Sequence, residues 1–498
     1  MKGVCIGPLL CGALGVAALA LGSCRDREEG PVRVTVIGEE QPRIVDPALG
    51  PLDRPTEVLL GNAAQGLVRF DAQGNIEAGL AERWNVSNDG LSYIFRLQTG
   101  EWPSGRKITA YDVARILRRQ LAPGSRNPLK DAFGAVDQIV AMTERVIEIR
   151  LAAPRPHLLQ LLAQPEFALV RNGEGTGPFT VAERAADEDG PLRLTREIGN
   201  PDEVERRPTE EVAFGAAAIV PAVQGFLGGR SDMVLGGTFV DVPYVTRTRL
   251  PRGTLRFDPV AGLFGLQPAR EGGLLTDPEV RALLDEAIDR QALVAALAVP
   301  DLEARASVLQ PALDGAIPPT VPEWAAVPLE ERREALVARG RALFAAEEGE
   351  EAPVLRVALP EGPGSTLLLR RLQADWGPLG LRVERAERAA RADLRLVDLV
   401  APSLSPAWFL RQFRCEVAPV CSEEANALLA AARVAPVAAQ RSALFAEAER
   451  LIREQVLFLP ITAPVRWSLV SRSVPGFVEN RFGRHTLTSL RNPPGENR

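Results

Sequence analysis

The chain has 498 residues, a formal net charge of −6, 24% charged residues and 46% hydrophobic residues. This balance is typical of a globular protein and not of a disordered one, and it provides no overall basic field that would favour nucleic acid. The length exceeds that of one hydrophobic core and predicts two large lobes or three smaller domains.

The first 23 residues have the layout of a secretory signal peptide. Lys2 precedes an uncharged apolar stretch at 4–21, and small residues follow it. The segment Leu21-Gly22-Ser23-Cys24 resembles the lipobox of bacterial lipoproteins, in which the cysteine is acylated before the signal is removed. We therefore expect lipid on Cys24 and a tether at residues 24–30. An ordinary cleaved signal with an incidental cysteine is the alternative.

The mature chain is expected to begin with a strand, a hairpin and a helix. The sequence VRVTVIG from Val32 is typical of a strand. Alternating apolar residues at 91–97, preceded by Asn88-Asp89-Gly90, predict a strand that pairs with residues 83–86 through a tight turn. Thr109 and Asp112 are spaced like a capping box and predict a helix start.

The order and identity of these pieces resemble the signature region of the family 5 extracellular solute-binding proteins, which are the oligopeptide, dipeptide and nickel receptors of ABC importers. Similar segments of that family follow in the same order at 175–179, 222–236, 276–297 and 425–467. The signature residues are Gly79-Leu80-Ala81, Trp84, Ser87, Asp89-Gly90, Tyr93, Phe95, Leu97, Trp102, Gly105, Thr109-Ala110 and Asp112-Val113.

The third of these segments also predicts a helix on its own terms. Asp277 would cap it, Pro278 would take its first position, and apolar residues from Val280 to Ile288 would share one face.

This resemblance implies an α/β fold of the two-lobed periplasmic-binding-protein type, of the large cluster C kind with an inserted subdomain at about 60–170. Lobe 1 would comprise 31–258 and 466–498, and lobe 2 would comprise 259–465. Two crossings, near 257–264 and 459–467, would form a hinge that closes on ligand.

The resemblance also implies a binding protein without enzymatic activity or cofactor. A small-molecule or peptide ligand would be delivered to the transmembrane subunits of an ABC permease. We expect a monomer on the periplasmic or extracytoplasmic side, held at the membrane by the lipid on Cys24 and not bound to nucleic acid.

One stretch departs from the family pattern. Peptide receptors of the family pin the ligand's ammonium group with an aspartate in a DYPDP-type stretch, but here Pro402 and Ser405 stand at the aspartate positions. A neutral serine cannot compensate the desolvation of an ammonium group as a carboxylate can. Asp398 could substitute, and a structural or solvated carboxylate is the alternative. Family position nominates these ligand-binding residues: Glu39, Gln41, Gln267, Asp398, Val400, Ser403 and Ser405.

Two further patterns involve cysteine and arginine. Cys415 and Cys421 are the only cysteines after Cys24, and export favours a disulfide between them. A metal site is disfavoured, because His157 and His485, the only histidines, are far away in sequence. The arginines spaced along 382–395 predict either a grip for an anionic ligand or a solvated helix face.

Two other functions remain open. A lipoprotein that kept the fold but lost transport, as a sensor or scaffold, is favoured by the altered stretch at 402–406. An exported hydrolase is disfavoured, because no G-x-S-x-G elbow or comparable nucleophile motif is present.

Overall fold

The structure is a computed structural model, and it describes these parts of the chain: 30–182, 190–198, 209–311, 313–315, 317–344 and 351–490. The predicted signal peptide and the lipidation at Cys24 lie outside the described residues.

The largest sheet has seven strands, in the order β12-β18-β11-β1-β10-β9-β8, and β1 runs parallel to both β10 and β11. Val32, Val34 and Val36 of β1 are at most 5% exposed, which confirms the predicted first strand. The helices α1 (Arg54–Ala63) and α4 (Ile219–Leu227) pack against β1. The strands are β1 (Val32–Ile37), β8 (Thr180–Ala182), β9 (Leu192–Glu197), β10 (Thr209–Ala217), β11 (Met233–Thr238), β12 (Leu255–Phe257) and β18 (Arg466–Val470).

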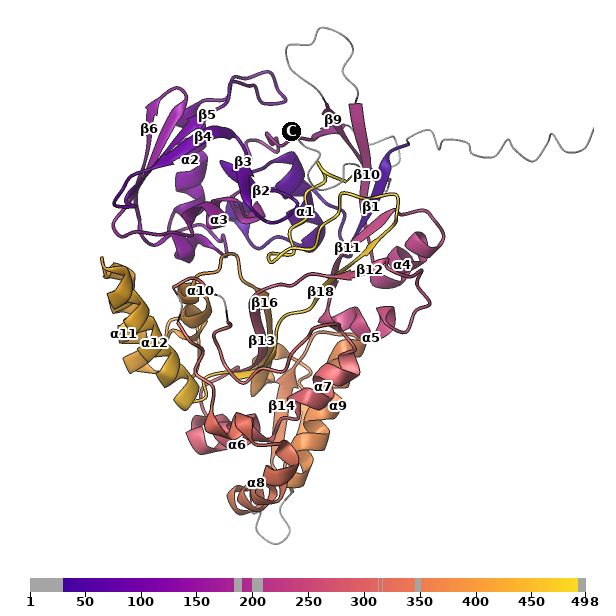
Figure 1. The fold of residues 1–498 in the computed structure, drawn as a ribbon, viewed down its shortest axis with the longest axis vertical. Helices are drawn as coiled ribbons and strands as arrows, with labels where there is room; N and C mark the ends of the chain where they lie inside the picture. The colour runs from indigo at the N-terminus through magenta and orange to yellow at the C-terminus, as the bar shows by residue number, and fades with distance from the viewer. Residues whose placement is uncertain are drawn as a thin grey trace, which may run out of the picture.

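A four-stranded antiparallel sheet, in the order β4-β5-β7-β6, forms a subdomain beside this sheet (Figure 1). The predicted hairpin is confirmed, because β4 pairs with β5 on either side of the turn at 87–91. The predicted helix start is confirmed as well: the Thr109 hydroxyl accepts from the Asp112 amide at 3.2 Å. The elements are β2 (Val68–Phe70), β3 (Ile76–Ala78), β4 (Ala81–Val86), β5 (Ser92–Leu97), α2 (Ala110–Leu121), β6 (Val136–Thr143), β7 (Val146–Leu151) and α3 (Leu158–Leu162).

The second lobe is built on a five-stranded sheet, in the order β15-β14-β16-β13-β17. Its strands are β13 (Gly262–Pro268), β14 (Val354–Ala358), β15 (Arg382–Arg385), β16 (Leu394–Val400) and β17 (Leu459–Thr462). The remaining helices are α5 (Val242–Val245), α6 (Pro278–Ala287), α7 (Arg290–Leu297), α8 (Leu329–Leu343), α9 (Pro363–Trp376), α10 (Pro406–Leu410), α11 (Glu423–Val434) and α12 (Ala438–Glu454).

The helix predicted from Asp277 begins as expected but is shorter. The Asp277 carboxylate accepts from the Glu279 amide at 2.8 Å, and α6 starts at Pro278. The helix ends at Ala287 because Ile288 is extended, and a new cap, Asp289, starts α7. Ile288 therefore belongs to a bend and not to the helix face.

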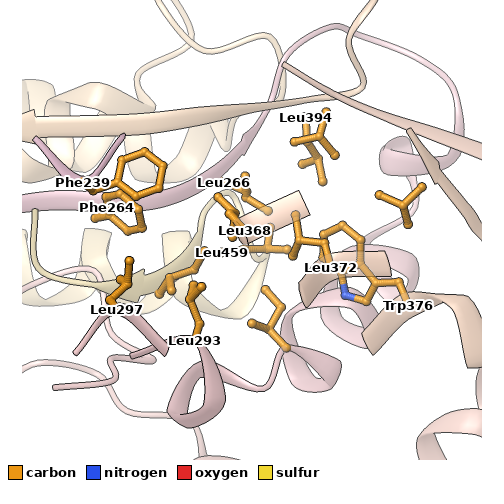
Figure 2. Close-up of a cluster of buried hydrophobic side chains, with 14 of the residues drawn as sticks. Phe239, Phe264, Leu266, Leu293, Leu297, Leu368, Leu372, Trp376, Leu394 and Leu459 are labelled. Carbon is orange, nitrogen blue, oxygen red and sulfur yellow. The ribbon is translucent and has the colours of Figure 1, made fainter. Parts of the chain in front are cut away.

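The chain passes between the two large sheets twice. Residues 258–261 link β12 to β13, and residues 463–465 link β17 to β18. One hydrophobic cluster extends across this region (Figure 2). Phe239, which follows β11, meets Phe264 of β13 with ring centroids 4.8 Å apart, and Trp376 of α9 lies buried farther along the same cluster. The lobes therefore share a core on the side of the crossings.

Candidate ligand-binding site between the lobes

A cavity of about 360 Å³ lies between the four-stranded subdomain and α10–α12 of the second lobe. Its volume falls in the range of about 300–1,000 Å³ that is usual for ligand sites. One wall comes from residues 131–135 and 154–157. The opposite wall comes from Asp314, Gly315 and Ile317 and from residues within 405–414 and 429–445.

Five arginines and only two carboxylates line this cavity. The arginines are Arg155, Arg411, Arg414, Arg433 and Arg441, and the carboxylates are Asp131 and Asp314. Each carboxylate already faces a basic group. Asp131 lies 3.7 Å from the Arg414 guanidinium, and Asp314 lies 3.2 Å from Nδ1 of His157.

Of the other four guanidinium groups, three donate to neutral backbone carbonyls, and the fourth has no acceptor among the described residues. Arg155 donates to the Arg433 carbonyl at 2.8 Å, and Arg441 donates to the Ala435 carbonyl at 3.0 Å. The Arg433 guanidinium lies 3.5 Å from the Gly134 carbonyl. Within the described part of the chain, the Arg411 side chain has no hydrogen bond or ion pair. Backbone carbonyls orient these arginines but do not neutralise their charge.

Burial, and then the excess of positive charge, lowers the pKa values of two of these arginines. Burial, together with the nearby guanidinium groups of Arg441 and Arg433, lowers the pKa of Arg155 to about 10. Burial and the charge of Arg414 likewise lower the pKa of Arg411 to about 10, against a weaker opposing effect of Asp131. Both groups stay protonated at neutral pH, so the cavity wall carries a net positive charge.

The floor of the cavity is apolar. Phe445, Leu429 and Ile317 are at most 9% exposed and belong to the core under α11 and α12, beside the buried Ala432. An open hollow of about 900 Å³ adjoins the cavity and shares Asp131, Gly134, Arg414 and Arg433 with it. The site therefore combines a cationic rim with an apolar base.

The altered stretch at 402–405 is docked on the subdomain. The side-chain amide of Gln164, which is 1% exposed, donates to the Pro402 carbonyl at 2.8 Å, and the Leu404 amide donates to Gln160 at 3.2 Å. Side chains of the subdomain thus hydrogen-bond the backbone of the stretch in which the family pattern has an ammonium-binding aspartate.

A second charged cluster lies in the first lobe beside the crossings. Arg484 donates to Glu57 at 2.7 Å and lies 3.3 Å from Glu166. Burial favours the neutral form of Glu57, but the cations Arg484, Arg54 and Arg466 outweigh it and hold the pKa of Glu57 below its usual range. Burial raises the pKa of Glu166 despite Arg484. Three guanidinium groups surround the two carboxylates of this cluster, and its hollow of about 50 Å³ is too small for a peptide.

The residues nominated by family position are spread over the molecule, and only Ser405 lines the cavity. Gln41 bonds both backbone groups of Ala216 at 3.3 and 3.4 Å, whereas Glu39 is exposed in the loop after β1. Val400 is half-buried at the end of β16, and Ser403 is 1% exposed.

Two nominated residues have partners inside the protein. Gln267 is 2% exposed, lies 3.3 Å from the Gln412 carbonyl and accepts from Arg395 at 2.8 Å, so it is not placed for a ligand. Asp398 accepts from Arg466 at 2.8 Å. This geometry favours the structural alternative for Asp398 over the ammonium anchor.

The arginines at 382–395 lie away from the cavity. Arg382 pairs with Glu384 at 3.0 Å on the exposed edge strand β15, and Arg385 donates to the Pro360 carbonyl at 3.1 Å. The predicted helix face is wrong, because Arg382 and Arg385 lie on β15 and Arg395 lies on β16. The exposed part of the segment agrees with a solvated role. Sequence reasoning missed the five cavity arginines, because they come from separate segments that form no motif.

Three further observations concern the cysteines, metals and the membrane. The sulfur atoms of Cys415 and Cys421 are 2.09 Å apart, at bonding distance, in the loop before α11. Across the described ranges, no group of three or more His, Cys, Asp or Glu side chains is arranged to hold a metal ion. No helix in those ranges is both long and apolar enough to cross a bilayer.

Known proteins resemble this chain in sequence and in fold. The "Probable di/tripeptide-binding protein 5" of Pseudomonas aeruginosa is 26% identical over 495 residues, which cover 85% of this chain and 89% of the relative. The Haemophilus influenzae OppA complex with RPPGFSPFR superposes with a TM-score of 0.76 at 16% identity, over 93% of this chain and 99% of OppA. Helicobacter pylori DppA in complex with the peptide STSA gives a TM-score of 0.69 at 18% identity, over 92% and 97% of the two chains.

The structural similarities show a shared two-lobed α/β fold of periplasmic binding proteins. Residues 75–394 match the family described as bacterial extracellular solute-binding proteins, family 5, over its middle region. Since this match covers more than half of the chain, the protein belongs to the family 5 bacterial extracellular solute-binding proteins.

Proposed function

We propose that this protein is the substrate-binding lipoprotein of an ABC importer and captures a peptide-like or other small polar solute between its lobes. The observation that carries the proposal is the cavity of about 360 Å³, whose walls come from both lobes. A ligand that touches both walls binds the closed form more tightly than the open form. Closure would then report the bound state to a permease.

The proposal includes the organisation predicted from the sequence. Lobe 1 comprises 31–258 and 466–498 and lobe 2 comprises 259–465, which is supported by the linkers at 258–261 and 463–465 between the two sheets. Lipid on Cys24 holds a monomer on the extracytoplasmic side, near the permease. The Cys415–Cys421 disulfide forms after export, since that compartment is oxidising.

A sensor or scaffold without a transported ligand is the second candidate. The observation that favours it is the docked stretch at 402–405, where Gln164 occupies the Pro402 carbonyl. A free peptide ammonium finds no available carboxylate at this position. An experiment with ligands can therefore distinguish a receptor that transports unmodified peptides from a scaffold that kept only the fold.

The test is thermal unfolding of the purified protein against di- to pentapeptides, N-blocked peptides, opines and sugars. A ligand that binds only the folded state at a hundredfold excess over Kd stabilises it by about 2.7 kcal/mol. We expect a saturable rise in Tm with one class of solute. Unchanged Tm values across all these classes would contradict a transport function and favour the scaffold.

A further inference from the structure

We propose that the cavity between the subdomain and α10–α12 binds a small organic anion, with a carboxylate on the arginine rim and an apolar body on the floor. This inference rests on the proposed function and specifies its ligand class. It concerns the residues around Arg411, not those nominated by family position.

The cavity lining carries more positive than negative charge. Five guanidinium groups and two carboxylates line it, and both carboxylates face His157 or Arg414. A set of like charges in a partly desolvated site is unfavourable unless an anion offsets it. Guanidinium groups bind carboxylates through two parallel hydrogen bonds, which suits an organic acid.

The Arg411 guanidinium is available to a ligand. Arg411 follows α10, lines the cavity and has no hydrogen bond or ion pair among the described residues. Arg155, on the opposite wall, donates only to the carbonyls of Pro154 and Arg433. A carboxylate between these walls would connect the subdomain to the second lobe, so its binding would favour closure.

The cavity lining disfavours a cationic ligand. A free ammonium group needs a carboxylate that is not already paired. Asp131 is paired with Arg414, and Ser405 is neutral. Asp314 lies beside His157, whose pKa is lowered by burial, and is the one remaining lining carboxylate against four guanidinium groups. We therefore expect a ligand with a net negative charge, such as an N-blocked peptide or a non-peptide organic acid.

The apolar floor sets the second requirement. Phe445, Leu429 and Ile317 are buried side chains that reach the cavity surface. These three side chains are already at most 9% exposed, so the apolar lining still open to water comes from residues such as Pro154, Pro156 and Ala407. A ligand body that covers this lining removes its apolar area from water. Simple inorganic anions leave this apolar surface exposed to water. We therefore expect them to bind more weakly than organic acids with an aliphatic body.

The test compares four probes of the same body: N-acetyl-Leu-Leu, N-acetyl-Leu-Leu-amide, Leu-Leu and Leu-Leu-amide. Isothermal titration calorimetry and thermal unfolding are measured with the purified protein at low ionic strength. We expect N-acetyl-Leu-Leu to bind at least tenfold more tightly than its neutral amide. The zwitterion should bind more weakly than the anion, and the cationic Leu-Leu-amide should not bind.

The matched variants are Arg411→Gln in the cavity and Arg450→Gln outside it. Arg450 lies on α12 and pairs with Glu447 and Glu454 at 2.6 Å on the surface. We expect R411Q to weaken N-acetyl-Leu-Leu at least tenfold without lowering the Tm of the ligand-free protein, because it removes an unpaired cation. R450Q should leave the affinity unchanged. If Arg411 had only a structural role, R411Q would lower the Tm and leave the affinity for N-acetyl-Leu-Leu unchanged.

The outcomes separate this inference from the proposed function. Binding of N-acetyl-Leu-Leu that is lost in R411Q supports both. Equal or tighter binding of the amide or of Leu-Leu-amide overturns the anion specificity but leaves a solute receptor. Absence of binding by all four probes, with a lowered Tm for R411Q, overturns the anion site. If none of the peptides, opines and sugars of the wider set raised the Tm, the proposed function would be overturned.

Discussion

Replacing Asp285 with Asn should be among the most damaging single changes in the second lobe. Asp285 lies in α6 and its side chain is 1% exposed. One carboxylate oxygen accepts from Arg290 and the other from Arg453, whose side chains are 6% and 3% exposed. Asparagine preserves the shape but removes the only charge that faces both guanidinium groups in this triad.

The loss of unfolding free energy in D285N depends on which hydrogen bonds Arg290 and Arg453 keep. Breaking a buried ion pair by removing one partner costs about 3–5 kcal/mol. Arg290 keeps the carbonyls of Arg305 and Pro460, at 3.0 and 2.7 Å, and Arg453 keeps the Phe458 carbonyl at 3.2 Å. These contacts place the expected loss at the lower end, about 3 kcal/mol.

The assay is urea unfolding followed by circular dichroism. With a denaturant slope of about 3 kcal/mol per M or more, the expected loss lowers the midpoint by up to about 1 M. Glu447→Gln is the control, because Glu447 pairs with Arg450 on the surface and its removal should not move the midpoint measurably. A midpoint for D285N equal to that of E447Q would refute the view that Asp285 is the required counter-charge.

Two other changes test local features. Burial raises the pKa of Asp241 above its ordinary value of 3.8, so the folded state disfavours its charged form. Asp241→Asn should therefore be more stable than the wild type at pH 7, and the difference in unfolding free energy should vanish as the pH falls below about 3.8; an equal gap at both pH values would contradict this. Cys415→Ser with Cys421→Ser opens a short loop, whose closure is worth about 2 kcal/mol, and should lower the urea midpoint only when the wild type is oxidised.

The sequence predicted those features that depend on neighbouring residues. The hairpin turn before Ser92 and the caps Thr109 and Asp277 follow from local hydrogen-bonding chemistry, and all are present. The bend at Ile288 was missed, because an apolar residue at the right spacing looks helical until the next cap at Asp289 competes for the backbone.

The candidate site was less predictable, because its residues converge from separate elements. Position along β13 nominated Gln267, but position does not fix whether a side chain faces a ligand or the interior. Asp398 finds Arg466, which is 68 residues away in sequence. Arg155 and Arg411 belong to no shared motif, and only the packing of the subdomain on α10–α12 brings them to one cavity.

The contacts between the lobes differ from one side to the other, and this difference determines how the cavity can open. Beside the crossings, Phe239 packs on Phe264, and α9 approaches so closely that a Cβ on Gly364 would lie 2.2 Å from the Phe239 carbonyl oxygen. Across the cavity, the contacts are polar, such as the hydrogen bond from Arg155 to the Arg433 carbonyl and the contact between His157 and Asp314, and water can replace them.

Opening should therefore separate the subdomain from α10–α12 and leave the shared apolar core intact, because the polar contacts cost far less to exchange with water than the core costs to expose. A ligand held by both Arg155 and Arg411 would join the lobes on the side where the contacts between them are polar and weakest. A modest binding energy there is enough to shift the balance toward the closed form.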